Sequence, residues 1–195
     1  MTAADDEIIV IVQGQLVGLG PLRRDLSPVY QRWVNDVRVH RTLALPGLPI
    51  SLEAEMDWLD GALKSRDAIF TIYELATMRP IGNTGLHAID HADGTAEFGI
   101  VIGEPDVWGK GYGTESTRLL LGYGFDVLGL HHIRLEVYAN NERAWRAYER
   151  AGFRRAGVLR QAKRIGRERF DVILMDVLAD QFPHSHLHEM MHPKP

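Results

Sequence analysis

Residues 107–116 read VWGKGYGTES, and this short stretch decides the fold because it separates an apolar run from a run with helical spacing. Its glycines are Gly109, Gly111 and Gly113, and Lys110 lies among them. Glycine permits positive φ and a close approach of the backbone, so several N–H groups can point at one anion where the next helix begins. The stretch therefore predicts a phosphate-binding turn, with an ordinary strand-to-helix connection as the alternative.

Two common nucleotide-binding motifs do not fit this stretch. A P-loop needs Gly-Lys-Ser/Thr after a four-residue gap, and no such triplet follows here. A dinucleotide fingerprint needs a further spaced glycine within a βαβ unit that opens the domain, and the chain offers neither. The neighbouring segments must therefore identify the anion.

The composition is that of a folded globular domain. The chain has 195 residues, of which 45% are hydrophobic and 25% charged, and its formal net charge is −4. Scattered basic residues argue against a nucleic-acid surface, and the absence of cysteine excludes disulfides and thiolate sites. No apolar run is long enough for a transmembrane helix, and the acidic start is unlike a signal peptide, so we expect a cytoplasmic protein. We expect one domain over residues 8–180, with flexible tails at 1–7 and 181–195.

Before the glycine stretch, the pattern predicts a hairpin, two helices and three antiparallel strands. Residues 7–22 contain two apolar runs around a turn. Ser27 before a proline is expected to cap a helix that runs to about residue 39. Ser51 is expected to cap a second helix. The buried stripe of that second helix is predicted to be Met56, Leu59 and Leu63. Residues 68–103 then read as three strands, with Asp93-Gly94 as the strongest hairpin turn.

After the glycine stretch, residues 114–128 predict a helix ended by Gly129, and residues 131–139 predict a half-buried strand. Strand, helix and strand in succession form a crossover, so this strand should pair in parallel with the strand before the glycine stretch. A short helix, capped by asparagine and ended by Gly152, precedes a hairpin that turns at Gly166-Arg167. The predicted fold class is α/β, in the sense of an α+β chain with a mixed sheet.

The order of elements, together with two motifs, resembles the GNAT superfamily of N-acetyltransferases, and within it the RimJ/RimL-like branch. The motifs are WGKGYGTES at 108–116 and NERAWRAYERAGF at 141–153. The resemblance implies the GNAT acyl-CoA N-acyltransferase fold, with a mostly antiparallel central sheet, one parallel splayed strand pair and flanking helices. It also implies an acyltransferase that moves the acetyl group of acetyl-CoA to a primary amine by direct attack in a ternary complex. The amine would be a protein N-terminus or a small molecule such as a polyamine.

The resemblance assigns part of the chain to the binding of acetyl-CoA. Backbone N–H groups of the glycine stretch would hold the pyrophosphate, at Trp108, Gly109, Lys110, Gly111, Tyr112, Gly113 and Thr114. The more widespread pattern has Arg or Gln where Trp108 stands, so one side-chain cation is missing. The thioester and the pantetheine arm would lie against Val101, Ile102 and Gly103, and Asn141 would contact the arm. An N–H aimed at the thioester oxygen would stabilise the oxyanion by ~3 kcal/mol.

Two residues are predicted to act in catalysis. Asn141 and Tyr148 lie seven residues apart, which puts them on nearly the same face of a helix. By resemblance, Tyr148 protonates the leaving thiolate, and a tyrosine with a pKa of ~10 stays protonated at neutral pH. Glu97 is predicted to be the base, working through ordered water, with His87 on the neighbouring strand as the alternative. An α-amine as acceptor would need little help from a base, because a larger fraction of it is neutral at pH 7.

Other functions stay open at this point. Another acyl-CoA, such as succinyl-CoA, would need a cation near the acyl tip, whereas a non-catalytic CoA-binding module would not need Tyr148. The expected partners are acetyl-CoA and an amine, without nucleic acid or membrane, and a homodimer is possible. The tail contains His184, His186, His188 and His192 and can bind a transition metal adventitiously. Because nothing in the tail, neither a carboxylate nor a scaffold, is seen to fix the geometry of such a site, no metal is assigned.

Overall fold

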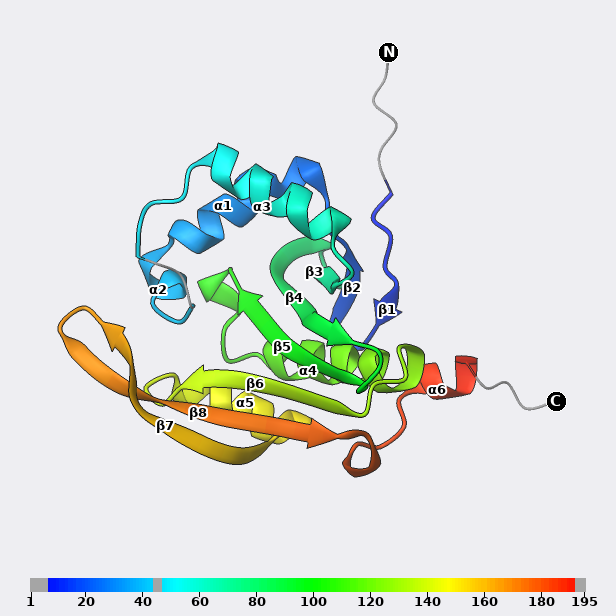
Figure 1. Cartoon of the computed structure of the whole chain (residues 1–195). Helices are drawn as coiled ribbons and strands as arrows, with labels where there is room; N and C mark the ends of the chain where they lie inside the picture. The colour runs from blue at the N-terminus through cyan, green and yellow to red at the C-terminus, as the bar shows by residue number, and fades with distance from the viewer. Residues whose placement is uncertain (1–6, 44–46, 192–195) are drawn as a thin grey trace, which may run out of the picture.

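The computed structural model describes residues 7–43 and 47–191. Within them lies an eight-stranded sheet, in the order β1-β2-β3-β4-β5-β6-β8-β7 (Figure 1). Neighbouring strands are antiparallel, except that β5 and β6 are parallel. The strands are β1 Val12–Gln13, β2 Val17–Pro21, β3 Ala68–Glu74, β4 Arg79–Asp90, β5 Thr95–Ile102, β6 His132–Tyr138, β7 Arg154–Ile165 and β8 Glu168–Leu178. The predicted mixed sheet with one parallel pair is confirmed.

The N-terminal hairpin is tied to the rest of the chain by one carboxylate. Glu115, in helix α4 (Tyr112–Gly122), accepts hydrogen bonds from the backbone N–H groups of Gln15, Leu16 and Val17 at 2.9, 2.7 and 2.8 Å. These N–H groups lie in the turn and at the start of β2, where a strand ladder leaves donors unpaired. Glu115 thereby fixes the hairpin beside the start of α4.

Helices cover both faces of the sheet. Along β3, Phe70 and Ile72 belong to the main core, to which α4 and α5 (Glu142–Ala151) also contribute. Ile69 instead packs against a smaller cluster that contains Tyr30 and Trp33. Successive strand residues point to opposite faces, so the smaller cluster lies on the other side of the sheet. Helices α1 (Ser27–Asn35) and α3 (Leu52–Lys64) contribute that cluster, and Figure 1 shows them grouped at one end of the molecule.

The first helical segment differs from its prediction. Asp36 has extended angles, φ −71° and ψ 116°, so the chain forms α1 and then a separate turn of helix, α2 (Val37–His40). The cap of this turn is Asp36, whose carboxylate accepts from the Arg38 N–H at 2.9 Å. Ser27 is not the cap of α1, since it lies within the helix and its hydroxyl donates to the Arg24 carbonyl at 2.6 Å. The capping prediction for Ser27 is wrong.

The second predicted helix begins where expected, but the residues that it buries differ from the prediction. Ser51 caps α3 by accepting from the Ala54 N–H at 3.2 Å. Leu59 is buried, but Met56 and Leu63 are 46% and 45% exposed. The buried face of α3 is therefore formed by Glu55, Leu59 and Ala62 rather than by Met56, Leu59 and Leu63, because the helix turns this face toward the small cluster beneath it.

The second half of the chain follows the predicted order. Helix α4 continues into a π-helical turn, η3 (Tyr123–Val127), and three short 3₁₀ turns complete the fold: η1 Arg24–Leu26, η2 Pro105–Val107 and η4 Ala179–Gln181. The segment after Asp180 contains helix α6 (His186–Met191), whose Leu187 is buried, although a loose tail is predicted there. Of the tail predicted at residues 1–7, residues 1–6 lie outside the described residues. Among the helices that are described, none has the length and apolar character to cross a membrane.

Candidate active site

The parallel strands β5 and β6 pair only at one end. Their register joins Thr95 to His132, Ala96 to Ile133 and Glu97 to Arg134, and no pair follows. Beyond Glu97, β5 stays with β4, and β6 stays with β8 to its end. The two strands therefore splay apart, as predicted, and the backbone groups of β5 that face the gap lack a strand partner.

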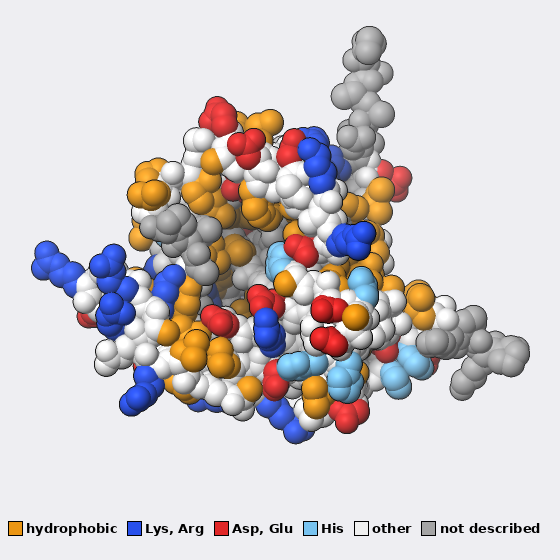
Figure 2. Space-filling view, in the orientation of Figure 1, with side chains coloured by type: hydrophobic (Ala, Val, Ile, Leu, Met, Phe, Trp, Pro, Cys, Tyr) orange, Lys and Arg blue, Asp and Glu red, His pale blue; other side chains and the backbone are white. Residues whose placement is uncertain are grey.

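A cavity of about 410 Å³ occupies the splay. Its lining includes residues 98–102 of β5 and residues 135–138 of β6, and helix α5 contributes Asn141 and Tyr148. On the opposite side, Thr42, Leu43 and Trp58 from the α2–α3 region close it. Figure 2 shows the molecule hollowed on this face, between the α1–α3 helices and the β7–β8 hairpin. The cavity thus has one wall from the splayed strands and another from the N-terminal helices.

The glycine stretch forms a turn that leads into α4. Gly109 and Gly111 have φ of 79° and 92°, which is a conformation that favours glycine. Gly111 is the N-cap and offers no side chain, so the N–H groups of Tyr112, Gly113 and Thr114 find no partner within the described chain. Free N–H groups at a helix N-terminus attract an anion, and all three residues line the cavity. The turn therefore presents N–H groups to the cavity, and their binding of a phosphate stays a prediction.

Trp108 closes the far end of the splay. Its indole N–H donates to the Ile102 carbonyl at 2.9 Å, on the edge of β5 that β6 has left. The guanidinium of Arg143, from α5, stacks over its ring at 3.6 Å from the ring centroid. Burial first, and the charge of Arg41 second, lower the pKa of Arg143. No acidic side chain of the described residues pairs with Arg143, so a cation without a counter-ion faces the cavity.

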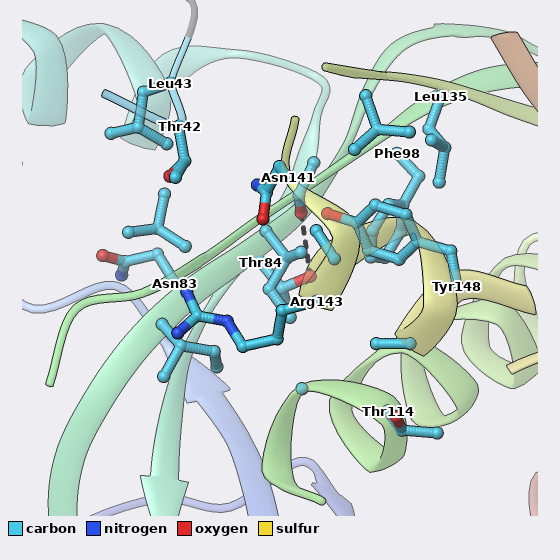
Figure 3. Close-up of a pocket in the computed structure, with 18 of the residues that line it drawn as sticks. Thr42, Leu43, Asn83, Thr84, Phe98, Thr114, Leu135, Asn141, Arg143 and Tyr148 are labelled. Carbon is cyan, nitrogen blue, oxygen red and sulfur yellow. Dashed lines mark hydrogen bonds between the residues drawn. The ribbon is translucent and has the colours of Figure 1, made fainter. Parts of the chain in front are cut away.

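Helix α5 brings Asn141 and Tyr148 to the cavity together. Asn141 is the N-cap of α5, as predicted, but its side chain makes no capping bond, so the amide is left for the cavity. Tyr148 packs edge-on against Phe98, with ring centroids 5.7 Å apart. Figure 3 shows its hydroxyl pointing into the cavity, on the side where Asn141 lies. Burial raises the pKa of Tyr148, with a smaller opposing effect from Arg143, so the hydroxyl stays protonated.

Comparison with known proteins identifies the family to which a chain with this cavity belongs. The sequence profile of the acetyltransferase (GNAT) domain matches residues 17–154, which is more than two thirds of the chain. The chain belongs to the GNAT acetyltransferase family. It is an acyltransferase whose acyl donor is acetyl-CoA, and the family chemistry requires no metal.

Three relatives of this GNAT protein illustrate the similarity. An uncharacterized N-acetyltransferase, p20, of Bacillus licheniformis is 29% identical over 63% of this chain and 68% of its own. Spermidine N(1)-acetyltransferase of Escherichia coli K12 is 34% identical over 54% of this chain and 56% of its own, so the match spans little more than half of that enzyme. The crystal structure of spermidine N-acetyltransferase from Vibrio cholerae, in complex with CoA and spermine, has a TM-score of 0.80 at 25% identity, covering 87% of this chain and 99% of that one.

Three predicted site residues lie outside the cavity lining of this acetyltransferase. Gly103 follows β5, donates its N–H to the Ile81 carbonyl at 2.9 Å and packs against Trp33, so that N–H is not free for a thioester. Lys110 is exposed at the tip of the glycine turn. Glu97 is 51% exposed, and its carboxylate pairs with Arg134, its neighbour in the register of β5 and β6.

His87 lines the cavity, and its neighbours hold the ring in place. Its Nδ1 lies 3.4 Å from an Asp67 carboxylate oxygen, while the other oxygen accepts from the Ala88 N–H at 3.1 Å. The Nε2 side of the ring lies over Gly85 and Gly99, and a Cβ added to either glycine would crowd the ring. By its sequence His87 is only the alternative base, because Asp67 is twenty residues away and its approach to the ring is not visible in the sequence. The motif at 141–153 also contains Arg143, and no pattern in the sequence marks this residue as part of the cavity lining.

Proposed function

We propose that this chain acetylates a primary amine, with the acetyl group of acetyl-CoA passing directly to the amine in a ternary complex. The main support for this proposal is the cavity between the splayed strands β5 and β6. The Tyr148 hydroxyl lies on one side of that cavity, and free N–H groups at the start of α4 lie at its end. The N–H groups of 112–114 suit the pyrophosphate, and the end of β5 at Val101 and Ile102, which lines the cavity, suits the pantetheine arm. An extended thiol ester between them would bring its acyl group beside Tyr148.

The reaction needs one bond made and one broken. The neutral amine nitrogen attacks the thioester carbonyl carbon, the carbon–sulfur bond breaks, and the sulfur takes a proton as it leaves. We assign that proton to the Tyr148 hydroxyl, which the described residues leave without a hydrogen-bond partner and whose raised pKa keeps it protonated. The chain has no cysteine to form an acyl-enzyme, which favours direct attack.

The amine must lose a proton, and His87 suits this step better than Glu97. A histidine whose Nδ1–H is donated to Asp67 presents Nε2 as an acceptor, and His87 lines the cavity. Glu97 lies opposite His87 in the β4–β5 register, but its carboxylate is engaged with Arg134. Its role through ordered water stays a prediction.

The identity of the acceptor follows from relatives rather than from the cavity. Two of the three named relatives are spermidine acetyltransferases, which supports a polyamine, whereas membership of the RimJ/RimL-like branch would support a protein N-terminus. Both belong to the class of primary amines. The branch, a cytoplasmic location, a homodimer and the absence of nucleic-acid binding stay predictions.

Acetyl-CoA is expected to raise the melting temperature of the protein by about 5–10 °C at a hundredfold excess over its Kd. Binding to the folded state alone stabilises by about 2.7 kcal/mol at that excess, and a chain of this size gains about 2–4 °C per kcal/mol. Differential scanning fluorimetry measures the shift, and thiol release with a panel of polyamines and N-terminal peptides then names the acceptor. No shift at millimolar acetyl-CoA would contradict the CoA site. A shift without thiol release for any amine would favour a non-catalytic CoA-binding module.

A second candidate, transfer of an acyl group that ends in a carboxylate, is favoured by Arg143. This guanidinium faces the cavity without a counter-ion among the described residues, and Figure 3 shows it reaching across toward Asn83. A charge-assisted hydrogen bond to a carboxylate contributes about 1.5–3 kcal/mol.

We expect Arg143→Gln to lower the ratio of kcat/KM for succinyl-CoA to kcat/KM for acetyl-CoA by about 10-fold or more, since that bond would be lost. Steady-state kinetics with both thioesters measure the ratio. Arg146→Gln is the matched control, because Arg146 lies on the same helix and pairs with Glu142 at 2.5 Å, outside the cavity lining. An unchanged ratio in Arg143→Gln would leave acetyl transfer as the sole candidate.

A further inference from the structure

The carboxylate of Asp126 contacts the histidine-rich C-terminal segment, although Asp126 precedes His184 by 58 residues in the chain. Asp126 lies in the π-helical turn η3, and its side chain is only 5% exposed. Its Oδ2 accepts from the N–H and the hydroxyl of Ser185 at 2.8 and 2.6 Å. Its Oδ1 lies 3.2 Å from Nδ1 of His184 and 3.4 Å from Nδ1 of His188. Two imidazole nitrogens and one carboxylate oxygen therefore converge on one point.

The spacing of these atoms suits ligands of one metal ion. In a tetrahedral zinc site with bonds of about 2.0–2.2 Å, neighbouring ligand atoms lie about 3.3–3.6 Å apart. The two Nδ1–Oδ1 distances in this cluster are 3.2 and 3.4 Å, and the three ligand atoms all lie within 4.8 Å of one another. Small movements of the exposed His184 ring would let an ion enter between them without moving the main chain.

The carboxylate is already oriented by a neighbour that would not itself bind the ion. Ser185 holds Oδ2 with two hydrogen bonds, which leaves Oδ1 directed at the imidazoles. Such hydrogen bonds to a ligating carboxylate fix its orientation in metal sites. The imidazoles are stacked, with centroids 3.8 Å apart, and neither Lys nor Arg pairs with Asp126 within the described chain.

We propose that Asp126, His184 and His188 bind a divalent first-row transition-metal ion of the Zn²⁺ class, with water completing the coordination. Imidazole nitrogen with one carboxylate oxygen suits Zn²⁺, Co²⁺ or Ni²⁺, whereas Ca²⁺ and Mg²⁺ prefer oxygen ligands throughout. None of the three residues lines the acyl-transfer cavity, so the proposed ion site is separate from that cavity.

The bound ion would join the end of the chain to the body of the protein. Helix α6 contacts η3 and α4 (Figure 1), and Figure 2 shows histidine side chains on the side of the molecule where α6 lies. A bound ion would be coordinated by Asp126 of η3 and by His184 and His188 of the C-terminal segment. These bonds would link that segment to η3. The site is therefore a structural clamp for the C-terminal segment.

The test uses the untagged full-length chain and Zn²⁺ or Co²⁺ as the probe. The absence of cysteine means that no thiolate competes for the ion. We expect one equivalent of Zn²⁺ to bind in isothermal titration calorimetry and to raise the melting temperature by at least about 3 °C. Co²⁺ is expected to give the visible absorption of a low-symmetry four- or five-coordinate site.

Two double variants separate this site from adventitious binding by any pair of histidines. The His184→Ala/His188→Ala variant is expected to lose at least tenfold in Zn²⁺ affinity and the whole thermal shift. The matched control, His186→Ala/His192→Ala, removes the same number of histidines from the same tail and should keep both; His192 lies outside the described residues. Equal binding by the two variants, or loss of binding in the control alone, would overturn the proposal. So would a wild-type chain that binds no Zn²⁺ at micromolar concentration.

Discussion

The Tyr148→Phe variant is expected to lose about 10²–10³-fold in kcat while its affinity for acetyl-CoA changes by less than about threefold. General-acid catalysis contributes typically about 10²–10⁴-fold, and only the hydroxyl is removed. The ring stays, so its edge-on contacts with Phe98 and Phe153, at 5.7 and 6.1 Å between centroids, persist in the variant. The melting temperature should therefore stay near that of the wild type.

Thiol release at saturating substrates measures kcat, and acetyl-CoA titration by calorimetry measures binding. Glu97→Gln is the comparison variant. Its carboxylate is half exposed and paired with Arg134, and exposed pairs contribute little, so we expect less than about a threefold change in kcat. Unchanged turnover in Tyr148→Phe would remove Tyr148 as the acid, and a large loss in Glu97→Gln would restore Glu97 as the base.

The pH dependence of turnover should follow the amine rather than Tyr148. Burial raises the pKa of Tyr148 above its ordinary value of 10, so the proton it donates is present throughout the neutral and moderately alkaline range. Turnover is then expected to rise with pH as the acceptor amine, with a pKa of about 8–10.4, loses its proton.

Gly103→Ala is expected to lower the free energy of unfolding by about 3 kcal/mol and the melting temperature by about 6–12 °C. A Cβ at this position would lie 2.1 Å from Cγ of Trp33, far inside van der Waals contact. Trp33 is buried, and its indole N–H donates to Glu104 at 2.8 Å, so its ring cannot swing away at low cost. Overpacking of this kind costs about 1–3 kcal/mol, and the fixed ring puts this site at the upper end.

Gly61→Ala is the matched control for this substitution. Gly61 lies in α3, is exposed, and has no atom within 4 Å of an added Cβ. Alanine favours helix over glycine by about 1 kcal/mol, so the variant should melt about 2–4 °C higher than the wild type. Chemical denaturation and calorimetry check both variants. A Gly103→Ala protein as stable as the wild type would show that Trp33 can relax, and that the close approach is not a constraint.

Sequence patterns predicted the order of the elements well because those patterns are local. The glycine turn, the Asp93-Gly94 hairpin and the alternation in β6 each depend on residues that are neighbours in the chain, and all three are present. The capping prediction for Ser27 failed because the 3₁₀ turn η1 runs directly into α1, so Ser27 has helical neighbours on both sides. The rotation of the buried face of α3, which includes Glu55, reflects what lies beneath the helix, and no local pattern carries that information.

The sequence by itself determined the family, the glycine turn that suits the acyl donor, and the joint placement of Asn141 and Tyr148 on one helix. These features rest on motifs and on the period of the α-helix, which act over a few residues. Only the tertiary structure decided that Glu97 pairs with Arg134 at the surface, that Asp67 reaches His87, and that Asp126 meets the C-terminal histidines. Such contacts join residues far apart in the chain, and their partners are chosen by the register of the strands and the packing of the helices.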